Sequence, residues 1–259
     1  MGSRVLLLIT PLVAAAACMV SPAPAPVQAQ EPGRAPAQRQ EPARGPGQGQ
    51  EADRRPGIAV LPFENGGVIG PDKEDFEPLT VGIQQMLLTE LAQNPAVRIV
   101  ERRILRDLIA EQDLGASGRV DPQTAARIGR LVGARYVVKG VFMDVMGTFR
   151  LDGHIVDVET SEIIKTEEVR DRREKLYDLL VELAHRIMVG VNLPELPAPV
   201  REARREREIP PEALALYSRA QVYEDAGRTD RAIELYRRIT QEFPQMTEAR
   251  EALQQLTGG

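Results

Sequence analysis

The chain has 259 residues, enough for one or two domains of ordinary size. Its 33 lysines and arginines and 38 aspartates and glutamates give a formal net charge of −5, and aromatic residues make up only 4% of the composition. This balance argues against a dedicated nucleic-acid-binding protein, which normally combines an excess of basic residues with aromatic side chains that stack on bases.

The first 18 residues have the pattern of an export signal. Arg4 precedes an apolar run over residues 5–17, which is too short to span a bilayer as a helix of the mature protein. The only cysteine, Cys18, follows three alanines and resembles the lipidated cysteine of a bacterial lipobox, although that pattern prefers leucine where Ala15 stands. The alternative is cleavage near Ala29. We therefore expect a protein of the cell envelope, located in the periplasm and tethered to the outer membrane through Cys18.

Residues 19–56 consist largely of Pro, Ala, Gln, Gly and Arg and contain almost no large apolar side chain. Such a segment cannot bury enough surface to offset the entropy lost on ordering. The composition predicts a linker that is disordered, with the folded region beginning at Gly57.

Two short strands and a helix are expected first in the folded region. The apolar residues 58–61 predict a strand covered on both faces, and the glycines that follow Pro62, at Gly66, Gly67 and Gly70, predict a loop. An apolar stripe over residues 79–93 predicts a helix, and residues 97–100 predict a second strand.

Residues 101–112 predict a helix rich in arginine. Ile104, Leu105, Leu108 and Ile109 recur at helical spacing and are expected to form one buried stripe. The arginines of the opposite side share it with acidic residues, and Arg103 and Asp107 are four positions apart, a spacing that pairs opposite charges. The pattern therefore predicts a solvated helix exterior and not a site that binds anions.

The next elements are a helix, three strands and a long helix. Asp121 is placed to cap a helix whose first turn contains Pro122. Strands are expected over residues 136–145, 151–158 and 163–169, with a tight turn at 159–162. The apolar spacing from Leu176 to Val191 predicts the long helix.

Several stretches of this region resemble the CsgG-like family, the curli production assembly and transport components. They are IAVLPFEN, VRIVERRILRDLIAEQDLGASGRVD, AARIGRLVGARYVVKG and VDVETSEII, and the likeness covers residues 57–191. A looser similarity runs to envelope domains of the TolB type. The resemblance implies an α/β (α+β) sandwich-type domain with a small mixed sheet flanked by helices.

The resemblance also implies two membrane-inserted hairpins per subunit, between the strands at 136–145 and 151–158 and just before the long helix. A strand that spans a membrane needs about 9–11 residues. The connections at 146–150 and 171–175 are too short for such hairpins. We therefore expect the periplasmic domain of this family without its membrane hairpins.

The C-terminal part reads as a second linker followed by a helical repeat. Residues 192–211 are rich in proline and charge, which predicts a solvated, semi-rigid spacer. Residues 212–259 resemble a tetratricopeptide repeat (TPR), an all-α helical hairpin, whose roughly 34-residue pattern is matched at Leu216, Ala220, Tyr223, Gly227, Ala232, Tyr236, Ile239 and Pro244. Arg219 departs from it, because the pattern prefers leucine there.

The TPR resemblance implies a partner-binding face. The residues expected to form it are Leu216, Ala220, Tyr223, Ala232 and Tyr236, although packing within the repeat is the alternative for the two tyrosines. A lone repeat buries its faces poorly. It should therefore pack on its own domain, on a second copy of the chain or on a partner's helix.

The sequence offers little that suggests catalysis. His154 and His185 are the only histidines, and the folded region has no cysteine, so that no zinc-binding spacing is present. The loop at Gly66–Gly70 lacks the Gly-Lys-Ser/Thr ending of a phosphate-binding loop. No local motif indicates a Ser-His-Asp or Cys-His set. We expect no enzyme activity, no metal site and no cofactor.

These patterns together favour a non-catalytic assembly or secretion component of the cell envelope. The expected partners are envelope proteins bound through the repeat and further copies of the chain bound through the α/β domain, with no nucleic acid. One alternative is a subunit of an outer-membrane secretion channel whose barrel is supplied by another chain, and a remote alternative is a periplasmic hydrolase. The sequence identifies neither the partner or cargo nor the oligomeric state.

Overall fold

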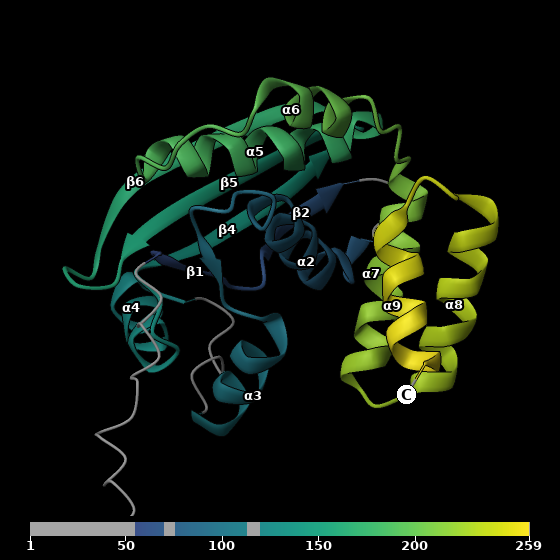
Figure 1. Ribbon diagram of the computed structural model, residues 1–259, viewed down its shortest axis with the longest axis horizontal. Helices are drawn as coiled ribbons and strands as arrows, with labels where there is room; N and C mark the ends of the chain where they lie inside the picture. The colour runs from purple at the N-terminus through teal and green to yellow at the C-terminus, as the bar shows by residue number, and fades with distance from the viewer. Residues whose placement is uncertain (1–54, 70–75, 113–119, 259) are drawn as a thin grey trace, which may run out of the picture. The chain divides into compact units, whose positions relative to one another are not determined.

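The computed structural model describes residues 55–69, 76–112 and 120–258 (Figure 1). The expected export signal, Cys18 and most of the first linker lie outside these residues. All the described residues belong to one compact unit, residues 49–259.

Six strands of the described residues form one mixed sheet. They are β1 (Gly57–Val60), β2 (Glu64–Ile69), β3 (Arg98–Ile99), β4 (Tyr136–Val145), β5 (Thr148–Asp157) and β6 (Glu162–Arg172). The order is β3-β1-β4-β5-β6, and β2 pairs with β4 further along that strand. The pairings of β1 with β3 and β4 are parallel, whereas β4, β5 and β6 pair antiparallel.

Helices cover both faces of the sheet and give it two cores. On one face, helices α2 (Leu79–Leu91) and α5 (Leu176–Gly190) pack on residues such as Val138 and Ile155. On the other, α3 (Arg102–Gln112) and α4 (Pro122–Leu131) pack on residues such as Val137 and Val156. Because neighbours in a strand point to opposite faces, Val137 and Val138 of β4 enter different cores. The expected mixed sheet flanked by helices is confirmed.

The expectation of a loop after Pro62 is wrong in part. Residues Glu64–Ile69 form strand β2, which lies parallel to β4 at the sheet edge. Its register shifts between Asn65 and Val68, and Gly67 has a φ of 132°, a conformation open to glycine. Two of the three glycines that suggested a loop, Gly66 and Gly67, therefore belong to a bulged strand that pairs with β4, and Gly70 lies outside the described residues.

The connections between β4 and β5 and between β6 and α5 are short, as expected from the sequence. Strands β4 and β5 join through a two-residue turn, in which Met146 and Gly147 have φ values of 54° and 85°. Strand β6 joins α5 through the 3-10 turn η1 (Arg173–Lys175). Neither connection has room for an inserted hairpin. Among the described residues, no helix combines the length and apolar character that a membrane crossing requires.

Four more helices follow α5. Helix α6 (Ala198–Arg205) lies along α5, and α7 (Pro211–Asp225), α8 (Thr229–Glu242) and α9 (Thr247–Thr257) form the helical repeat (Figure 1). The expected solvated spacer at 192–211 differs from the structure. The side chains of Arg204 and Arg207 are only 15% and 14% exposed, because both bind buried carboxylates.

The repeat packs on its own α/β domain, one of the three arrangements that the sequence left open. Leu214 and Tyr217 of α7 belong to the same hydrophobic core as Ile83 and Leu87 of α2. The two helices cross where Gly82 meets Ser218, and a Cβ atom added to Gly82 would lie 1.7 Å from Ser218 Oγ. This close approach requires glycine at position 82.

Candidate functional site

The arginine face of α3 holds the repeat. Arg102 binds Asp225 of α7 and donates a hydrogen bond of 2.5 Å to the side-chain oxygen of Gln221. Arg106 binds the other carboxylate oxygen of Asp225 at 2.8 Å, and Arg103 lies 3.7 Å from Glu224. We call this set of contacts the arginine clasp. The prediction of a solvated face is wrong for Arg102, whose side chain is 10% exposed, whereas the side chains of Arg103 and Arg106 are 68% and 37% exposed. The anionic partner of this face is supplied by the same chain.

Two details of the α3 prediction also differ. Asp107 pairs with Arg106 at 2.7 Å, and not with Arg103. In the expected buried stripe, Leu105 is buried and Leu108 and Ile109 are partly buried, but the side chain of Ile104 is 53% exposed. Helix α3 is therefore turned so that its arginines, rather than Ile104, meet a neighbouring element.

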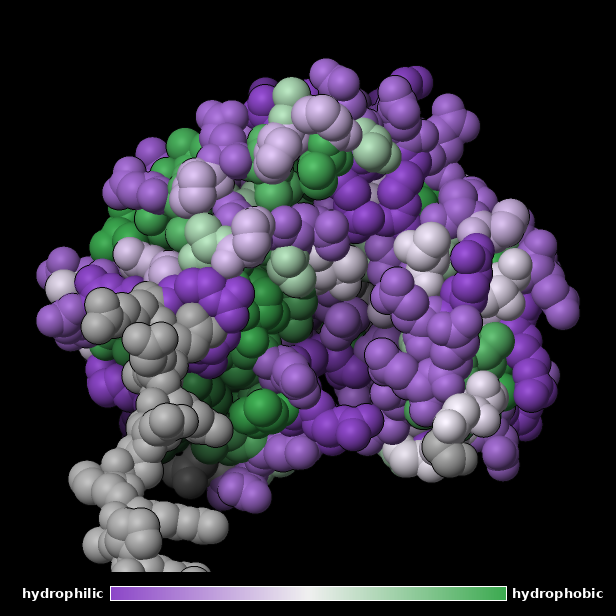
Figure 2. Space-filling model, in the orientation of Figure 1, coloured by the Kyte–Doolittle hydropathy of each residue, from purple (hydrophilic) through white to green (hydrophobic). Residues whose placement is uncertain are grey.

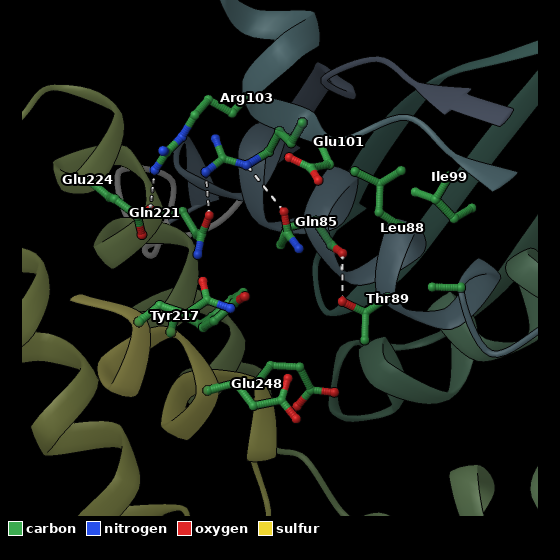
Figure 3. Close-up of a pocket in the computed structure, with 15 residues that line it drawn as sticks. Gln85, Leu88, Thr89, Ile99, Glu101, Arg103, Tyr217, Gln221, Glu224 and Glu248 are labelled. Carbon is green, nitrogen blue, oxygen red and sulfur yellow. Dashed lines mark hydrogen bonds and ion pairs between the residues drawn. The ribbon is translucent and has the colours of Figure 1, made fainter. Parts of the chain in front are cut away.

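A groove of about 490 Å³ lies beside the clasp, between α2 and α3 on one side and α7 and α9 on the other (Figure 3). Apolar atoms of Leu88, Ile99, Tyr217 and Ala252 contribute to its lining. Mainly hydrophilic residues surround the opening between the repeat and the α/β domain (Figure 2). The polar residues of the lining are Gln85, Thr89, Glu101, Arg102, Arg103, Gln221, Glu224, Glu248, Glu251 and Gln255.

The charges in the groove are not all neutralised. Arg102, Arg103, Glu224 and Glu248 make the ion pairs of the clasp or of the network described next. Glu101 and Glu251 line opposite walls, are exposed, and make no ion pair with any described residue. The charge left for a ligand is therefore negative and favours a cationic group.

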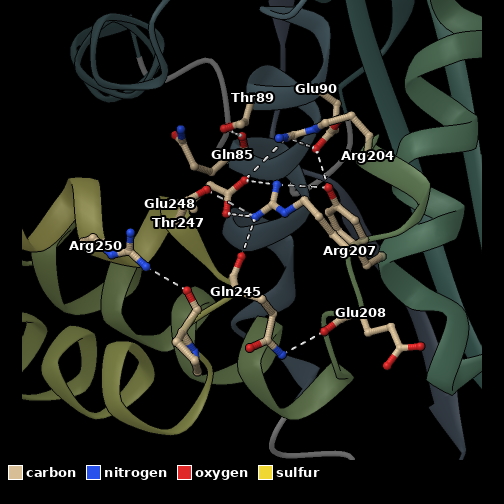
Figure 4. A network of polar contacts seen from close by, with 12 residues as sticks. Gln85, Thr89, Glu90, Arg204, Arg207, Glu208, Gln245, Thr247, Glu248 and Arg250 are labelled. Carbon is tan, nitrogen blue, oxygen red and sulfur yellow. Dashed lines mark hydrogen bonds and ion pairs between the residues drawn. The ribbon is translucent and has the colours of Figure 1, made fainter. Parts of the chain in front are cut away.

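A buried polar network fixes the base of the groove (Figure 4). Glu90 of α2, only 3% exposed, is bound by Arg204 and accepts a hydrogen bond of 3.1 Å from the Tyr177 hydroxyl. Arg207 binds Glu248 of α9 at 2.6 Å and donates to the same hydroxyl at 3.1 Å. The network thus joins α2, α5, α9 and the segment that was expected to be a spacer.

Ionisation in this network follows from burial and charge. Burial opposes ionisation of Glu248, but the hydrogen bond and charge of Arg207, with the charge of Arg204, hold the pKa of its carboxyl below the usual range. Burial raises the pKa of the Tyr177 hydroxyl, and the charge of Glu90 adds to the rise. Tyr177 therefore stays protonated and can donate to Glu90.

Four of the five residues expected to bind a partner are buried. Leu216, Ala220, Ala232 and Tyr236 lie within the repeat or against the α/β domain, and Tyr223 is partly buried. The hydroxyl of Tyr236 donates to Glu224 at 3.0 Å and accepts from Gln221 at 2.5 Å. These side chains shape the helices that form the groove, and their direct contact with a partner stays a prediction.

Sequence reasoning missed four polar residues that line the groove, of which Gln85 is partly buried and the other three are exposed. Gln85, Glu101, Glu251 and Gln255 come from three separate parts of the chain and line one hollow. Exposed polar positions of helices look alike in a sequence until the opposing wall is known. Only the separation of Glu251 and Gln255 by four positions, which puts them on one face of a helix, could have grouped any of them.

The two histidines line different hollows. His154 of β5 lies 3.0 Å from the Thr166 hydroxyl, in a depression shared with Glu64 and Lys139. His185 was expected on the polar side of its helix, but it lies beneath α6 with a buried Nδ1 that has no hydrogen-bond partner among the described residues. The described part of the chain holds no cluster of three or more His, Cys, Asp or Glu suited to a metal ion.

Two protein-family models match parts of this chain. Residues 46–144 match the curli production assembly/transport component CsgG, and residues 213–256 match a tetratricopeptide repeat. No curated protein matches the chain.

Several solved structures are similar to part of the chain. The C-terminal domain of LpoB from Salmonella enterica is 22% identical, with 46% of this chain and 83% of that chain covered and a TM-score of 0.33. TolB from Acinetobacter baumannii is 16% identical, with 54% and 28% covered and a TM-score of 0.34. The PelC dodecamer from Paraburkholderia phytofirmans is 14% identical, with 56% and 91% covered and a TM-score of 0.33. The chain thus joins a CsgG domain to a C-terminal tetratricopeptide repeat, the architecture that its sequence resembles.

Proposed function

We propose that the protein is a non-catalytic adaptor of the cell envelope that holds a segment of a partner protein in the groove between its two domains. The observation that carries this proposal is the groove itself, whose walls are the CsgG domain on one side and the inner helices of the repeat on the other. The clasp and the buried network keep the two walls apart at a fixed spacing. A binding site that is already formed loses little entropy when it takes a ligand.

The lining specifies the chemistry of the segment. Apolar atoms from Leu88, Tyr217 and Ala252 suit small apolar side chains, and the exposed amide of Gln255 can pair with an extended backbone. Glu101 and Glu251 suit a lysine or arginine between those side chains. We therefore propose a partner segment with one or two basic residues flanked by small apolar ones.

Cross-linking from the groove tests this proposal. A photoreactive amino acid at Gln255 should give a discrete cross-linked partner in cells of the native host, whereas the same group at Gln241, exposed on α8, should not. Glu251→Lys should abolish the cross-link, because it places a cation where the partner's basic residue lies. Equal cross-linking from both positions, or a cross-link that survives Glu251→Lys, contradicts the proposal.

We also propose that the protein is located in the periplasm and anchored to the outer membrane through lipidated Cys18. The support is the export pattern of the first 18 residues together with the position of that cysteine. Cys18→Ala should move the protein from the membrane fraction to the soluble fraction, with Gln255→Ala as a control that keeps the anchor. Unchanged membrane retention of Cys18→Ala contradicts the anchor but leaves the groove proposal standing.

A further inference from the structure

Strand β6 has a free edge. It is 11 residues long and ends the strand order of the described sheet, with β5 as its neighbour on one side (Figure 1). Only Val169 in this strand is buried, and Ile163 and Ile164 are 42% and 43% exposed. A free edge presents unpaired backbone N–H and C=O groups that can pair with another strand.

The charges along β6 suit a second copy of the same strand. In an antiparallel pair, residues directly opposite each other point to the same face. With a two-fold axis at Thr166, Lys165 of each copy lies opposite Glu167 of the second copy, and the two Thr166 residues face each other. Lys165 and Glu167 already lie on one face, 3.8 Å apart, so pairing completes a square of four charges with alternating sign.

Neighbouring registers that keep the same faces together are unfavourable. An axis at Lys165 places two lysines opposite each other, and an axis at Glu167 or Glu168 does the same for two glutamates. Like charges directly opposite each other destabilise a strand pair. Thr166 is therefore the one position between Lys165 and Glu168 that puts no like charges together on the axis.

The bulge in β6 limits the length of this pairing. The register between β5 and β6 shifts between Ile155 and Val156, which leaves Ile164 as the extra residue on β6. Regular pairing then covers residues 165–167 of each copy, because the Glu168 carbonyl oxygen already accepts a hydrogen bond of 2.9 Å from Arg186. Further from the axis, Glu162 of one copy and Arg170 of the second copy have opposite charges. The ends of the strands are therefore compatible with the register centred on Thr166.

We propose that β6 is a homodimer interface, in which two copies pair antiparallel about Thr166 and join their sheets into one. The pairing satisfies the free backbone groups of residues 165–167 at both edges. No residue of β6 lines the groove, so failure of this proposal leaves the groove proposal unaffected.

A single engineered cysteine tests the register. In the mature chain with Cys18→Ser, Thr166→Cys places two thiols on the axis, where opposing Cα atoms lie about 4.5–5.5 Å apart. That separation falls in the disulfide range of about 4.4–6.8 Å. Mild oxidation should therefore give a covalent dimer. The matched control Arg170→Cys should not, because its two thiols are separated by eight residues, or roughly 26 Å.

A charge swap tests the chemistry. Lys165→Glu opposes two pairs of glutamates across the axis and should weaken dimerisation about tenfold in sedimentation experiments. The double variant Lys165→Glu/Glu167→Lys restores the alternating square and should recover the dimer. Circular dichroism checks that each variant is folded. A wild-type chain that stays monomeric at high concentration, equal disulfide formation at positions 166 and 170, or a swap that fails to recover the dimer would overturn the proposal.

Discussion

His154 is a side chain whose surroundings oppose its positive charge. Burial lowers the pKa of the imidazole, and the nearby charge of Lys139 lowers it further, while Asp152 and Glu64 act in the opposite direction. A histidine whose pKa is lower in the folded state than in the unfolded chain binds fewer protons when folded. The folded state is therefore penalised as the pH falls below the ordinary histidine value of about 6.5.

We predict that the free energy of unfolding falls between pH 7 and pH 5 and that His154→Gln reduces this fall. Glutamine is neutral at both pH values and can keep a hydrogen bond to Thr166. Urea titrations at several pH values measure the effect. An identical pH dependence in the variant and the wild type would show that His154 contributes nothing to it.

At the scale of elements, the crossing of α2 and α7 depends on the absence of one methyl group. Alanine normally stabilises a helix relative to glycine by up to about 1 kcal/mol. At position 82, however, a new Cβ meets Ser218 Oγ at 1.7 Å and Ser218 Cβ at 2.6 Å, and that hydroxyl is held by a hydrogen bond of 2.6 Å to the Leu214 carbonyl oxygen. The clash should outweigh the gain in helix propensity.

We predict that Gly82→Ala lowers the free energy of unfolding by about 1–3 kcal/mol, the usual cost of overpacking. Gly153→Ala is a matched control with a smaller expected cost, because its nearest neighbour is a methyl group of Leu183 at 3.1 Å. Ser218→Gly added to Gly82→Ala should recover part of the loss, since it removes the atoms that clash. If Gly82→Ala is as stable as the wild type in urea, α7 does not cross α2 at this point.

The clasp between α3 and α7 is the second contact between elements that can be tested. We predict that Asp225→Asn lowers the free energy of unfolding by about 2 kcal/mol, because Arg102 is 10% exposed and loses its carboxylate partner. Hydrogen exchange should accelerate in α3 more than in α5. Glu234→Gln, in an exposed ion pair with Arg231, should change neither measurement.

Elements with a strong periodic pattern could be predicted from the sequence, and contacts between distant elements could not. The long helix α5, the capped helix α4 and strand β4 were predicted within a residue or two, because local spacing and capping determine them. Strand β2 was missed, because its glycines are extended only through pairing with β4. The arginines of α3 were assigned to solvent, because periodicity places a residue on a side of a helix without showing what packs there.

At the scale of the whole molecule, the two domains share one hydrophobic core and one buried ion network. Residues 49–259 form one compact unit, so we expect a single cooperative unfolding transition. The sequence division at residues 191 and 212 stays a prediction about separate domains. The groove could not be predicted, because its walls meet only after residues far apart in the chain have packed together.

We predict that Glu90→Gln lowers the free energy of unfolding by about 2–4 kcal/mol, since it removes the nearer counter-charge of Arg204, whose side chain is only 15% exposed, and leaves only Glu248 at 3.5 Å. Replacing both residues, as in Glu90→Met/Arg204→Met, should cost less than the sum of the two single changes. Urea denaturation followed by far-ultraviolet circular dichroism measures Glu90→Gln, the double variant and the two single methionine variants. Additive costs would indicate that the two side chains do not interact.

The close crossing at Gly82 also has a mechanical consequence. Helix backbones with no space for a methyl group between them cannot slide past each other, and α2 is in turn tied to the sheet by a hydrogen bond of 2.6 Å from Gln84 to the Val60 carbonyl oxygen. A force applied to the C-terminal helices is therefore expected to be transmitted through α2 to strand β1 of the sheet.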